Sequence, residues 1–322
     1  MVVLVLTRQL DPTADLVVEE LTRRHVPVVR MNPSELLKRG SFDARIDSAG
    51  TWSGELEVER GPLDLADIRS IYYRRPDKII KPEENSYSEK FAQAEADAAF
   101  WGVLSSLPAL WLNHPDANRR ADNKALQLSV AAQCGLDIPV TAITNKSTSA
   151  RRFAAERDTV YKAMAKPAGT TTNGHAMAIY TSPVVPNDID ESVTVTTHLF
   201  QERIPKSYEI RLTVVGPEAF AARIDAHSAA AALDFRADYA SLTYQLVEVP
   251  PRTLESVRRL MSEFGLTYGA LDFIVTGDQW TFLEVNPNGQ WGWIAHETGA
   301  PIASAIADLL EDPCLTLSYA AI

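Results

Sequence analysis

The sequence predicts a mixed α/β protein made of three successive parts. Residues 2–6 form a short apolar run, residues 15–24 carry apolar side chains at helical spacing, and residues 26–32 form a second apolar run. This order is typical of a parallel α/β unit. The C-terminal half instead carries strand-like segments joined by short glycine-containing turns, which indicates antiparallel sheet. A chain of 322 residues is long enough for two or three domains with their own cores.

The first predicted part is a small parallel α/β domain over residues 1–113. Residues 70–76 are expected to form a strand that carries Arg74 and Arg75 at its end, and residues 88–107 a long helix. The apolar face expected for this helix consists of Phe91, Ala94, Ala98, Trp101 and Leu104. The turn after the first strand contains no glycine, so it lacks the glycine-rich loop of dinucleotide-binding proteins.

The second predicted part covers residues 114–198. A helix is expected to begin near Asp116 or Asn118 and to end at Gly135, because Asp and Asn cap helices and glycine ends them. The further elements expected are a strand at 139–144, a helix at 147–157 and two strands at the ends of residues 159–183. Backbone N–H groups of the small-residue segment 168–176 could cover phosphates, although alone such a segment is more typical of a plain hairpin loop.

The third predicted part covers residues 199–322. Its expected elements are strands at 197–204, 208–216 and 219–228, helices at 253–264 and 302–310, and a hairpin at 268–289. With a three-residue turn at 277–279, Asp272 would lie directly opposite Glu284 in this hairpin. Asp272, Glu284 and Asn286 would then share one face, and Leu271, Phe273, Val275, Leu283 and Val285 the other.

Three oxygen ligands without His or Cys suit a hard cation such as Mg²⁺ or Mn²⁺. The simpler interpretation is a solvated polar face on an amphipathic hairpin. Composition disfavours nucleic-acid-binding and membrane proteins. The net charge of −11 provides no overall field for nucleic acid, and no apolar run reaches the ~20 residues of a membrane helix. Cys134 and Cys314 share no motif, and no signal sequence is evident, so we expect a cytoplasmic protein.

The order of these motifs resembles that of ATP-grasp carboxylate–amine ligases. Asp272 followed by "LEVNPNG" resembles their metal-binding end, residues 113–141 their entry to the nucleotide domain, and residues 199–216 their hinge. The resemblance covers roughly residues 113–310, and the first part matches the pre-grasp domain of the family. Within the family, "YYRRP", "RADNKALQL" and "EVNPNGQW" are most similar to microviridin-type graspetide synthetases and next to ribosomal-protein glutamate ligases.

The resemblance implies an ATP-grasp fold in which two α+β subdomains clasp ATP. It also implies transfer of the γ-phosphoryl group to a carboxylate, followed by attack of an amine or hydroxyl on the acyl phosphate. Two Mg²⁺ ions, or Mn²⁺, would bind Asp272, Glu284 and Asn286, with Glu284 bridging both. Arg211 would hold the transferring phosphoryl group, and Arg223 is a second candidate for that role or for the carboxylate.

The resemblance also assigns the nucleotide contacts. Lys124 would be the first nucleotide lysine and Lys162 the second, with Lys166 as the alternative to Lys162. The adenine hinge would consist of Gln201, Glu202, Arg203 and Ile204, and the ribose acid would be Glu209. On spacing alone, Glu202 and Glu209 would be interpreted as exposed strand acids.

Two smaller features concern the substrate. An arginine pair can bind a carboxylate bidentately, so Arg74 and Arg75, with Arg119 and Arg120, are candidates for contacts to an acidic peptide. A solvated basic strand end explains them equally well. Trp291 and Trp293 could pack against the substrate, but we expect at least one of them in the core.

The function favoured is an ATP-dependent maturase of a ribosomal precursor peptide. It would join Asp or Glu side chains to Ser/Thr hydroxyls or Lys amines, giving ω-esters or ω-amides. The partner would be a peptide with a leader segment and an Asp/Glu-rich core, with the leader near residues 206–240, and relatives imply a homodimer. One alternative is a ligase that adds a free amino acid to a peptide or small carboxylate. A second is an inactive nucleotide- or peptide-binding regulator.

Overall fold

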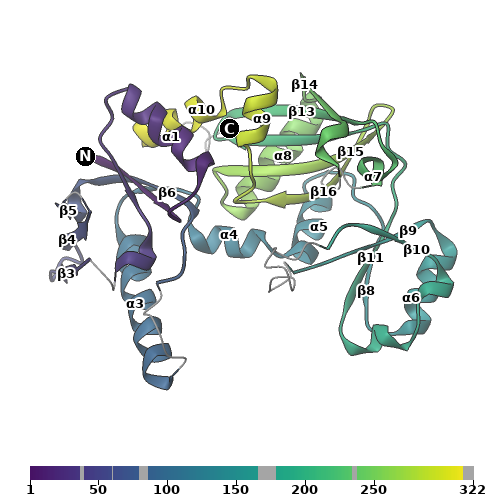
Figure 1. Ribbon diagram of the computed structural model, residues 1–322, viewed down its shortest axis with the longest axis horizontal. Helices are drawn as coiled ribbons and strands as arrows, with labels where there is room; N and C mark the ends of the chain where they lie inside the picture. The colour runs from purple at the N-terminus through teal and green to yellow at the C-terminus, as the bar shows by residue number, and fades with distance from the viewer. Residues whose placement is uncertain (37–39, 60, 80–85, 166–178, 234–237, 315–322) are drawn as a thin grey trace.

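The computed structural model describes residues 1–36, 40–59, 61–79, 86–165, 179–233 and 238–314. In these residues the strands form four sheets, which lie in an N-terminal, a central and a C-terminal part (Figure 1). The mixed α/β class is therefore confirmed. None of the helices in the described ranges is both long and apolar enough to cross a membrane.

The N-terminal part contains the expected parallel sheet, in the order β2-β1-β6-β7. Its elements are β1 (Val2–Thr7), α1 (Pro12–Arg23), β2 (Val28–Met31), β6 (Ile68–Arg75), α3 (Tyr87–Ser106) and β7 (Leu110–Leu112). Helix α1 begins where the Asp11 carboxylate accepts a hydrogen bond from the Ala14 N–H. An antiparallel sheet that was not predicted lies beside it, formed by β3 (Phe42–Ile46), β4 (Trp52–Val58) and β5 (Gly61–Asp64).

The expected apolar face of α3 is correct at Leu104 and Trp101, which lie at the core, and wrong nearer the start of the helix. Phe91 is 58% exposed, whereas Phe100, Val103 and Leu104 are buried. The N-terminal half of α3 extends beyond the sheet, so only its last turns reach the core (Figure 1). An apolar spacing identifies a helix here, but it does not identify which turns are covered.

The central part begins with two helices in place of the single one expected. Asn123 interrupts the run, because its side chain accepts a hydrogen bond from the Leu126 N–H and caps a new helix. The elements are α4 (Pro115–Ala121), α5 (Lys124–Gln133), β8 (Thr141–Thr144), α6 (Ser147–Glu156), β9 (Thr159–Lys162), β10 (Ser182–Val184) and β11 (His198–Glu202). The strands form an antiparallel sheet in the order β10-β9-β11-β8. Lys166 and the whole small-residue segment 168–176 lie outside the described residues.

The C-terminal part is an antiparallel sheet in the order β14-β13-β12-β15-β16. Its elements are β12 (Tyr208–Val215), β13 (Glu218–Ala226), α7 (Ala229–Leu233), β14 (Leu242–Val247), α8 (Pro251–Phe264), β15 (Tyr268–Thr276), β16 (Gln279–Asn286), α9 (Gly292–Thr298) and α10 (Ile302–Glu311). Short 3-10 helices cover Pro33–Glu35, Leu65–Asp67, Pro186–Asp188, Glu191–Val195 and Tyr239–Ser241. Strands β14, β7 and helix α9 were not predicted.

The β15–β16 hairpin reaches the predicted register by a different route. Thr276 pairs with Gln279, so the turn has two residues, and Gly277 supplies the positive φ of 60° that such a turn needs. A bulge then shifts the register between Asp272 and Phe273, which restores Asp272 opposite Glu284. The bulge also places Phe282, and not Leu283, in the apolar core.

The apolar cores divide the chain differently from the three predicted spans. One core combines α1 and β1 of the N-terminal part with α9 and α10 from the end of the chain. Helices α4 and α5 pack with α8 on the C-terminal sheet. Residues of α6, β11 and the neighbouring 3-10 helices form a separate small core. The boundaries near residues 113 and 198 therefore remain an interpretation of the chain order.

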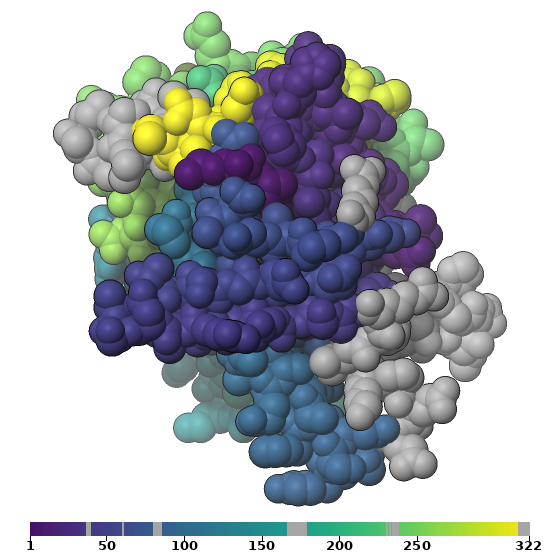
Figure 2. Space-filling view, turned by 90° about the vertical axis from the view of Figure 1, so that its left-hand side faces the viewer, coloured from purple at the N-terminus to yellow at the C-terminus, as the bar shows by residue number. Residues whose placement is uncertain are grey.

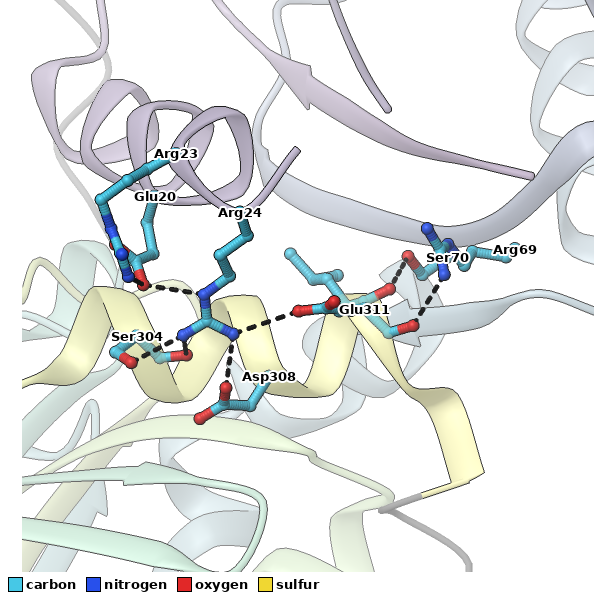
Figure 3. A network of polar contacts seen from close by, with 9 residues as sticks. Glu20, Arg23, Arg24, Arg69, Ser70, Ser304, Asp308 and Glu311 are labelled. Carbon is cyan, nitrogen blue, oxygen red and sulfur yellow. Dashed lines mark hydrogen bonds and ion pairs between the residues drawn. The ribbon is translucent and has the colours of Figure 1, made fainter. Parts of the chain in front are cut away.

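Polar contacts reinforce the packing of α10 on the N-terminal part. The Arg24 guanidinium points between Glu20 on its own helix and Asp308 and Glu311 on α10 (Figure 3). Its Nη2 also donates to the Ser304 hydroxyl at 2.7 Å. Nearby, the Ser70 hydroxyl donates to the Leu310 carbonyl at 2.7 Å. The surface view shows the C-terminal residues lying directly against the N-terminal ones (Figure 2).

This network predicts an acid-sensitive contribution to stability. Hydrogen bonds from Arg23 and Arg24 lower the pKa of Glu20 from 4.5 to about 2. Because the folded pKa is depressed, the contribution is complete above about pH 4.5 and is lost as the pH falls towards about 2. Glu20→Gln should lower the urea midpoint at neutral pH, and the loss of stability on acidification should become shallower. Glu19→Gln, an exposed neighbour on the same helix, is the matched control and should behave as the wild type.

Candidate active site

Arg211 and the predicted metal ligands meet on one face of the C-terminal sheet. Asp272 lies opposite both Arg211 on β12 and Glu284 on β16, and cross-strand partners share a face. The Arg211 Nη1 lies 3.0 Å from Asp272 Oδ1, and both side chains are largely buried. The Asn286 amide donates to Asp272 Oδ2 at 3.2 Å and to Glu284 Oε1 at 3.3 Å. The structure therefore brings these four predicted residues together.

Two lysines complete the cluster around Glu284. Lys124 Nζ lies 3.0 Å from Glu284 Oε2 and donates to the Ala163 carbonyl at 3.0 Å. Burial alone would raise the pKa of Glu284, but Lys124 and Lys162 outweigh it and lower this pKa. Burial lowers the pKa of Lys162, and the negative charge of Glu284 opposes this change. Glu284 is thus a partly buried carboxylate that two lysine ammonium groups keep ionised.

Helix α5 is held against β16 by a buried side chain that the sequence did not single out. Gln127 Nε2 donates to the Val285 carbonyl at 2.9 Å, and its Oε1 accepts from the Val285 N–H at 2.9 Å. The side chain thereby takes the place of a neighbouring strand at the edge of the sheet. Lys124 lies one turn before Gln127 on α5, so this contact brings Lys124 to Glu284. Its position in a helix gave no signal of this role.

The donor set fits a hard cation that completes its shell with other oxygens. Asp272, Glu284 and Asn286 offer carboxylate and amide oxygens only, which suits Mg²⁺ or Mn²⁺. Within the described ranges, no group of three or more His, Cys, Asp and Glu side chains gathers as a metal site. A cation bound here would therefore depend on water and phosphate oxygens for the rest of its shell.

In the predicted hinge, Gln201 lies on the expected face of the sheet, whereas the Glu202 carboxylate and the Arg203 N–H already form hydrogen bonds within the protein. Gln201 and Lys162 share the face of the central sheet opposite to that on which Phe200 packs with α6. The Glu202 side chain accepts from the Val140 N–H at 3.4 Å. The Arg203 N–H donates to the Asp158 carbonyl at 2.8 Å, so it does not point to an adenine. Of the predicted backbone contacts at Arg203 and Ile204, the Arg203 carbonyl and the Ile204 backbone stay candidates for the adenine.

Glu209 lies on the same face of β12 as Arg211, because the two residues are two apart. Its carboxylate forms an ion pair with Lys206, and both side chains are largely buried. Glu209 therefore faces the site, as the prediction of a ligand-binding acid requires. Glu209 is therefore not the exposed strand acid that spacing alone favoured.

Arg223 does not join the site. It lies opposite Ile210, which is in the core on the other face of the sheet, whereas Arg211 lies opposite Ala222. Its guanidinium forms a two-point contact with Asp225, at 2.7 and 2.8 Å, and lies over the Tyr208 ring. The alternation of side chains along β13 could have revealed this once the pairing with β12 was known.

Arg74 is also unavailable to a substrate. It is 1% exposed, its Nη1 donates to the Asn288 carbonyl at 2.7 Å, and its Nη2 donates to the Gln290 side chain. Its charge is balanced by Asp11, which is equally buried and lies 3.9 Å from Nε. Arg75 is half-buried and donates to the same Asn288 carbonyl at 3.2 Å. The pair thus divides into a structural arginine and one that is partly accessible.

Hydrogen bonds from side chains hold the successive backbone carbonyls after Asn286. The Pro287 carbonyl accepts from the Asn113 side chain at 3.0 Å, and the Gly289 carbonyl accepts from the Tyr268 hydroxyl at 2.8 Å. Asn288 is held by the two arginines. A Cβ on Gly289 would lie 2.4 Å from that of Ala270, so only glycine fits this approach. Side chains from distant parts of the chain therefore preorganise the end of the metal strand.

The remaining candidates lie elsewhere. Arg119 is exposed and pairs with Asp116, and Arg120 donates to the Glu263 carbonyl and lies over Phe264, so neither joins Arg75. Trp291 is completely buried, as expected for at least one tryptophan. The half-buried Trp293 ring lies 6.0 Å from the Arg211 guanidinium carbon.

Comparisons with known proteins agree with this geometry. The family model of the MvdD pre-ATP-grasp domain matches residues 2–119. The macrocyclase MdnC of Microcystis aeruginosa MRC, bound with precursor peptide MdnA, is 29% identical, with a TM-score of 0.83 over 97% of this chain and 100% of that chain. A RiPP-associated ATP-grasp ligase of Chryseobacterium gregarium, in complex with ADP and a leader and core peptide, is 29% identical, with a TM-score of 0.87 over 97% of each chain.

A more distant structure shares the fold alone. The ATP-grasp ligase PsnB, complexed with minimal precursor, Mg and ADP, is 19% identical, with a TM-score of 0.75 over 98% of each chain. No curated protein matches the sequence. The arrangement of the fold, the clustered acids and lysines and these similarities agree. The chain has the fold of the ATP-grasp ligases and is similar to them over nearly its whole length, and residues 2–119 match the MvdD pre-ATP-grasp domain.

Proposed function

We propose that this ligase matures a ribosomal precursor peptide by activating Asp or Glu side chains as acyl phosphates. A Ser or Thr hydroxyl or a Lys amine of the same peptide then attacks, which forms an ω-ester or ω-amide and releases ADP and phosphate. The observation that carries the proposal is the cluster of charged, mostly half-buried side chains formed by Arg211, Asp272, Glu284, Lys124 and Lys162. Two relatives with similar structures over nearly the whole chain are described as bound to precursor, leader or core peptides.

The residues divide the chemistry between positioning and charge neutralisation. Lys124 and Lys162 hold the ATP phosphates, and Gln201 lines the nucleotide face of the central sheet. Arg211 holds the transferring phosphoryl group with its planar guanidinium. Asp272, Glu284 and Asn286 would hold the cation, and Mg²⁺ bound there supplies Lewis-acid stabilisation of the phosphate oxygens.

The acids must exchange partners when the site fills. Asp272 is paired with Arg211 and Glu284 with Lys124, so each carboxylate is neutralised before a cation binds. Cation and ATP together bring positive and negative charge in comparable amounts. Arg211 and the lysines can then turn to phosphate oxygens while the carboxylates take the cation. Preorganised partners of both signs keep this exchange inexpensive in free energy.

The alternative of an inactive regulator is disfavoured by the same cluster. An ionised carboxylate held by lysines in a partly buried site carries a desolvation cost that nucleotide recognition alone does not require. The ligase that adds a free amino acid would use the same cluster, so only the substrate separates it from the maturase. The homodimer implied by resemblance is part of the proposal, and light scattering would measure it.

The test is a mass spectrum of a peptide encoded beside the gene, incubated with the protein, ATP and Mg²⁺. The maturase predicts loss of one water mass per bond together with ADP, and hydroxylamine cleavage then separates esters from amides. A gain of one amino-acid residue would instead support the free amino-acid ligase. If the peptide is unchanged and ADP is released only when another carboxylate is added, the peptide is not the substrate, but the protein is still a ligase.

A further inference from the structure

Arginines converge where two parallel strands of the N-terminal sheet end. Arg8 directly follows β1, and Arg74 and Arg75 close β6. The two strands are neighbours, and the Arg8 N–H donates to the Arg75 carbonyl at 3.0 Å. Burial lowers the pKa of Arg75, the charges of Arg74 and Arg8 add to this, and the Asp11 carboxylate opposes them. The backbone contact therefore brings three arginines together at the ends of two neighbouring strands.

The positive charge at this point exceeds the negative charge. Asp11 balances Arg74, and the Thr7 hydroxyl donates to Asp11 at 2.9 Å. Across the described ranges, no carboxylate forms an ion pair with either Arg8 or Arg75. The half-buried Arg75 has the Asn288 carbonyl as a neutral acceptor at 3.2 Å, and Arg8 is exposed. An anion would therefore relieve the repulsion between Arg8 and Arg75.

The position of Arg75 determines which anion fits. Asn288 is two residues beyond Asn286, so their Cα atoms are at most ~7 Å apart. An anion on Arg75 therefore lies near the cation site but outside it. An extended peptide rises ~3.3 Å per residue, so acidic residues two to four positions apart in a peptide can reach both points at once.

We infer that Arg75 and Arg8 bind a second carboxylate of the peptide, a few residues from the carboxylate that is activated. The inference rests on the proposed function, because it identifies an acidic peptide as the occupant. Arg74 acts as a positioning residue: its bonds to Asn288 and Asp11 hold the end of β6 against the metal segment. The subsite would give preference to substrates with two or more acidic side chains.

The test measures peptide binding without turnover. The probe is a labelled synthetic peptide of Glu and Thr, compared with the same peptide carrying Gln in place of Glu, in the presence of ADP and Mg²⁺. Fluorescence anisotropy should show that wild type prefers the Glu peptide. Arg75→Gln should weaken its binding roughly tenfold, and Arg8→Gln several-fold. The affinity for the Gln peptide and for ADP should not change, and Arg75→Lys should restore part of the loss.

The matched control is Arg45→Gln, since Arg45 is an exposed arginine of the same part that lies on β3. If Arg45→Gln loses as much affinity for the Glu peptide as the Arg75 and Arg8 variants, the effect is one of general charge, and the inference is overturned. Unchanged binding in both Arg75→Gln and Arg8→Gln would also overturn it. Because Arg8 is exposed, its variant tests the idea even if Arg75→Gln fails to fold.

The outcome is separable from that of the proposed function. If the Glu peptide binds through Arg75 but no cross-link forms in the precursor when ATP is supplied, the proposed maturase activity is wrong and the carboxylate subsite stands. If the precursor is processed normally while both arginine variants bind the Glu peptide as the wild type does, the subsite fails and the maturase stands.

Discussion

Replacing Glu284 by Gln is expected to reduce kcat on the order of 10³-fold while the fold stays intact. Glu284 is the carboxylate that Lys124 and Lys162 keep ionised, and it lies beside Asp272 and Asn286. The substitution keeps the shape of the side chain and removes the charge that a cation needs. Steady-state ADP release at saturating ATP and a thermal unfolding curve together measure the effect.

Glu218→Gln is the control for this prediction, because Glu218 is an exposed acid of the same sheet. It should keep wild-type kcat. Turnover by Glu284→Gln within a few-fold of wild type would mean that this carboxylate does not hold the essential cation. A large loss of thermal stability would instead show that the ion pair with Lys124 serves the fold.

Replacing Arg211 by Lys should lower kcat by roughly 10²–10³ with a smaller change in the KM for ATP. Lysine keeps the positive charge that balances Asp272, so folding should be preserved. It loses the planar fork that can contact two phosphoryl oxygens at once. An effect confined to kcat would mark an interaction made in the transition state.

Arg223→Lys is the matched partner experiment. Both arginines lie on adjacent strands, but Arg223 faces the opposite side of the sheet and contacts Asp225. Its substitution should change kcat by less than about twofold. Equal losses in the two variants would contradict the assignment of the active face.

The site acids were predictable because they break an apolar pattern. Glu284 and Asn286 interrupt a buried strand at a spacing of two, and such side chains are expensive to bury without a purpose. The predicted turn was nevertheless wrong. A shorter turn and a bulge cancel one another, so the correct facing pair emerged from an incorrect loop. A bulge depends on the contacts of both strands, which a single strand pattern does not contain.

The errors concern residues whose role depends on pairing across long distances. Arg74 and Arg75 are adjacent in sequence and both donate to the Asn288 carbonyl, yet only Arg74 is buried against Asp11 and the Gln290 side chain. Arg223 was assigned to the site because its strand is next to that of Arg211, and only the register reveals its face. Gln127, Asn113 and Tyr268 support the metal segment through single side chains, and no local pattern marks them.

The most direct measurement follows the oxygen atoms of the reacting carboxylate. A precursor peptide with its Asp and Glu carboxylates enriched in the heavy oxygen isotope would be incubated with the enzyme, ATP and Mg²⁺. The account predicts that each bond formed transfers one labelled oxygen to inorganic phosphate, while the other remains in the new ester or amide. Unlabelled phosphate released together with a modified peptide would contradict activation of the carboxylate by phosphoryl transfer.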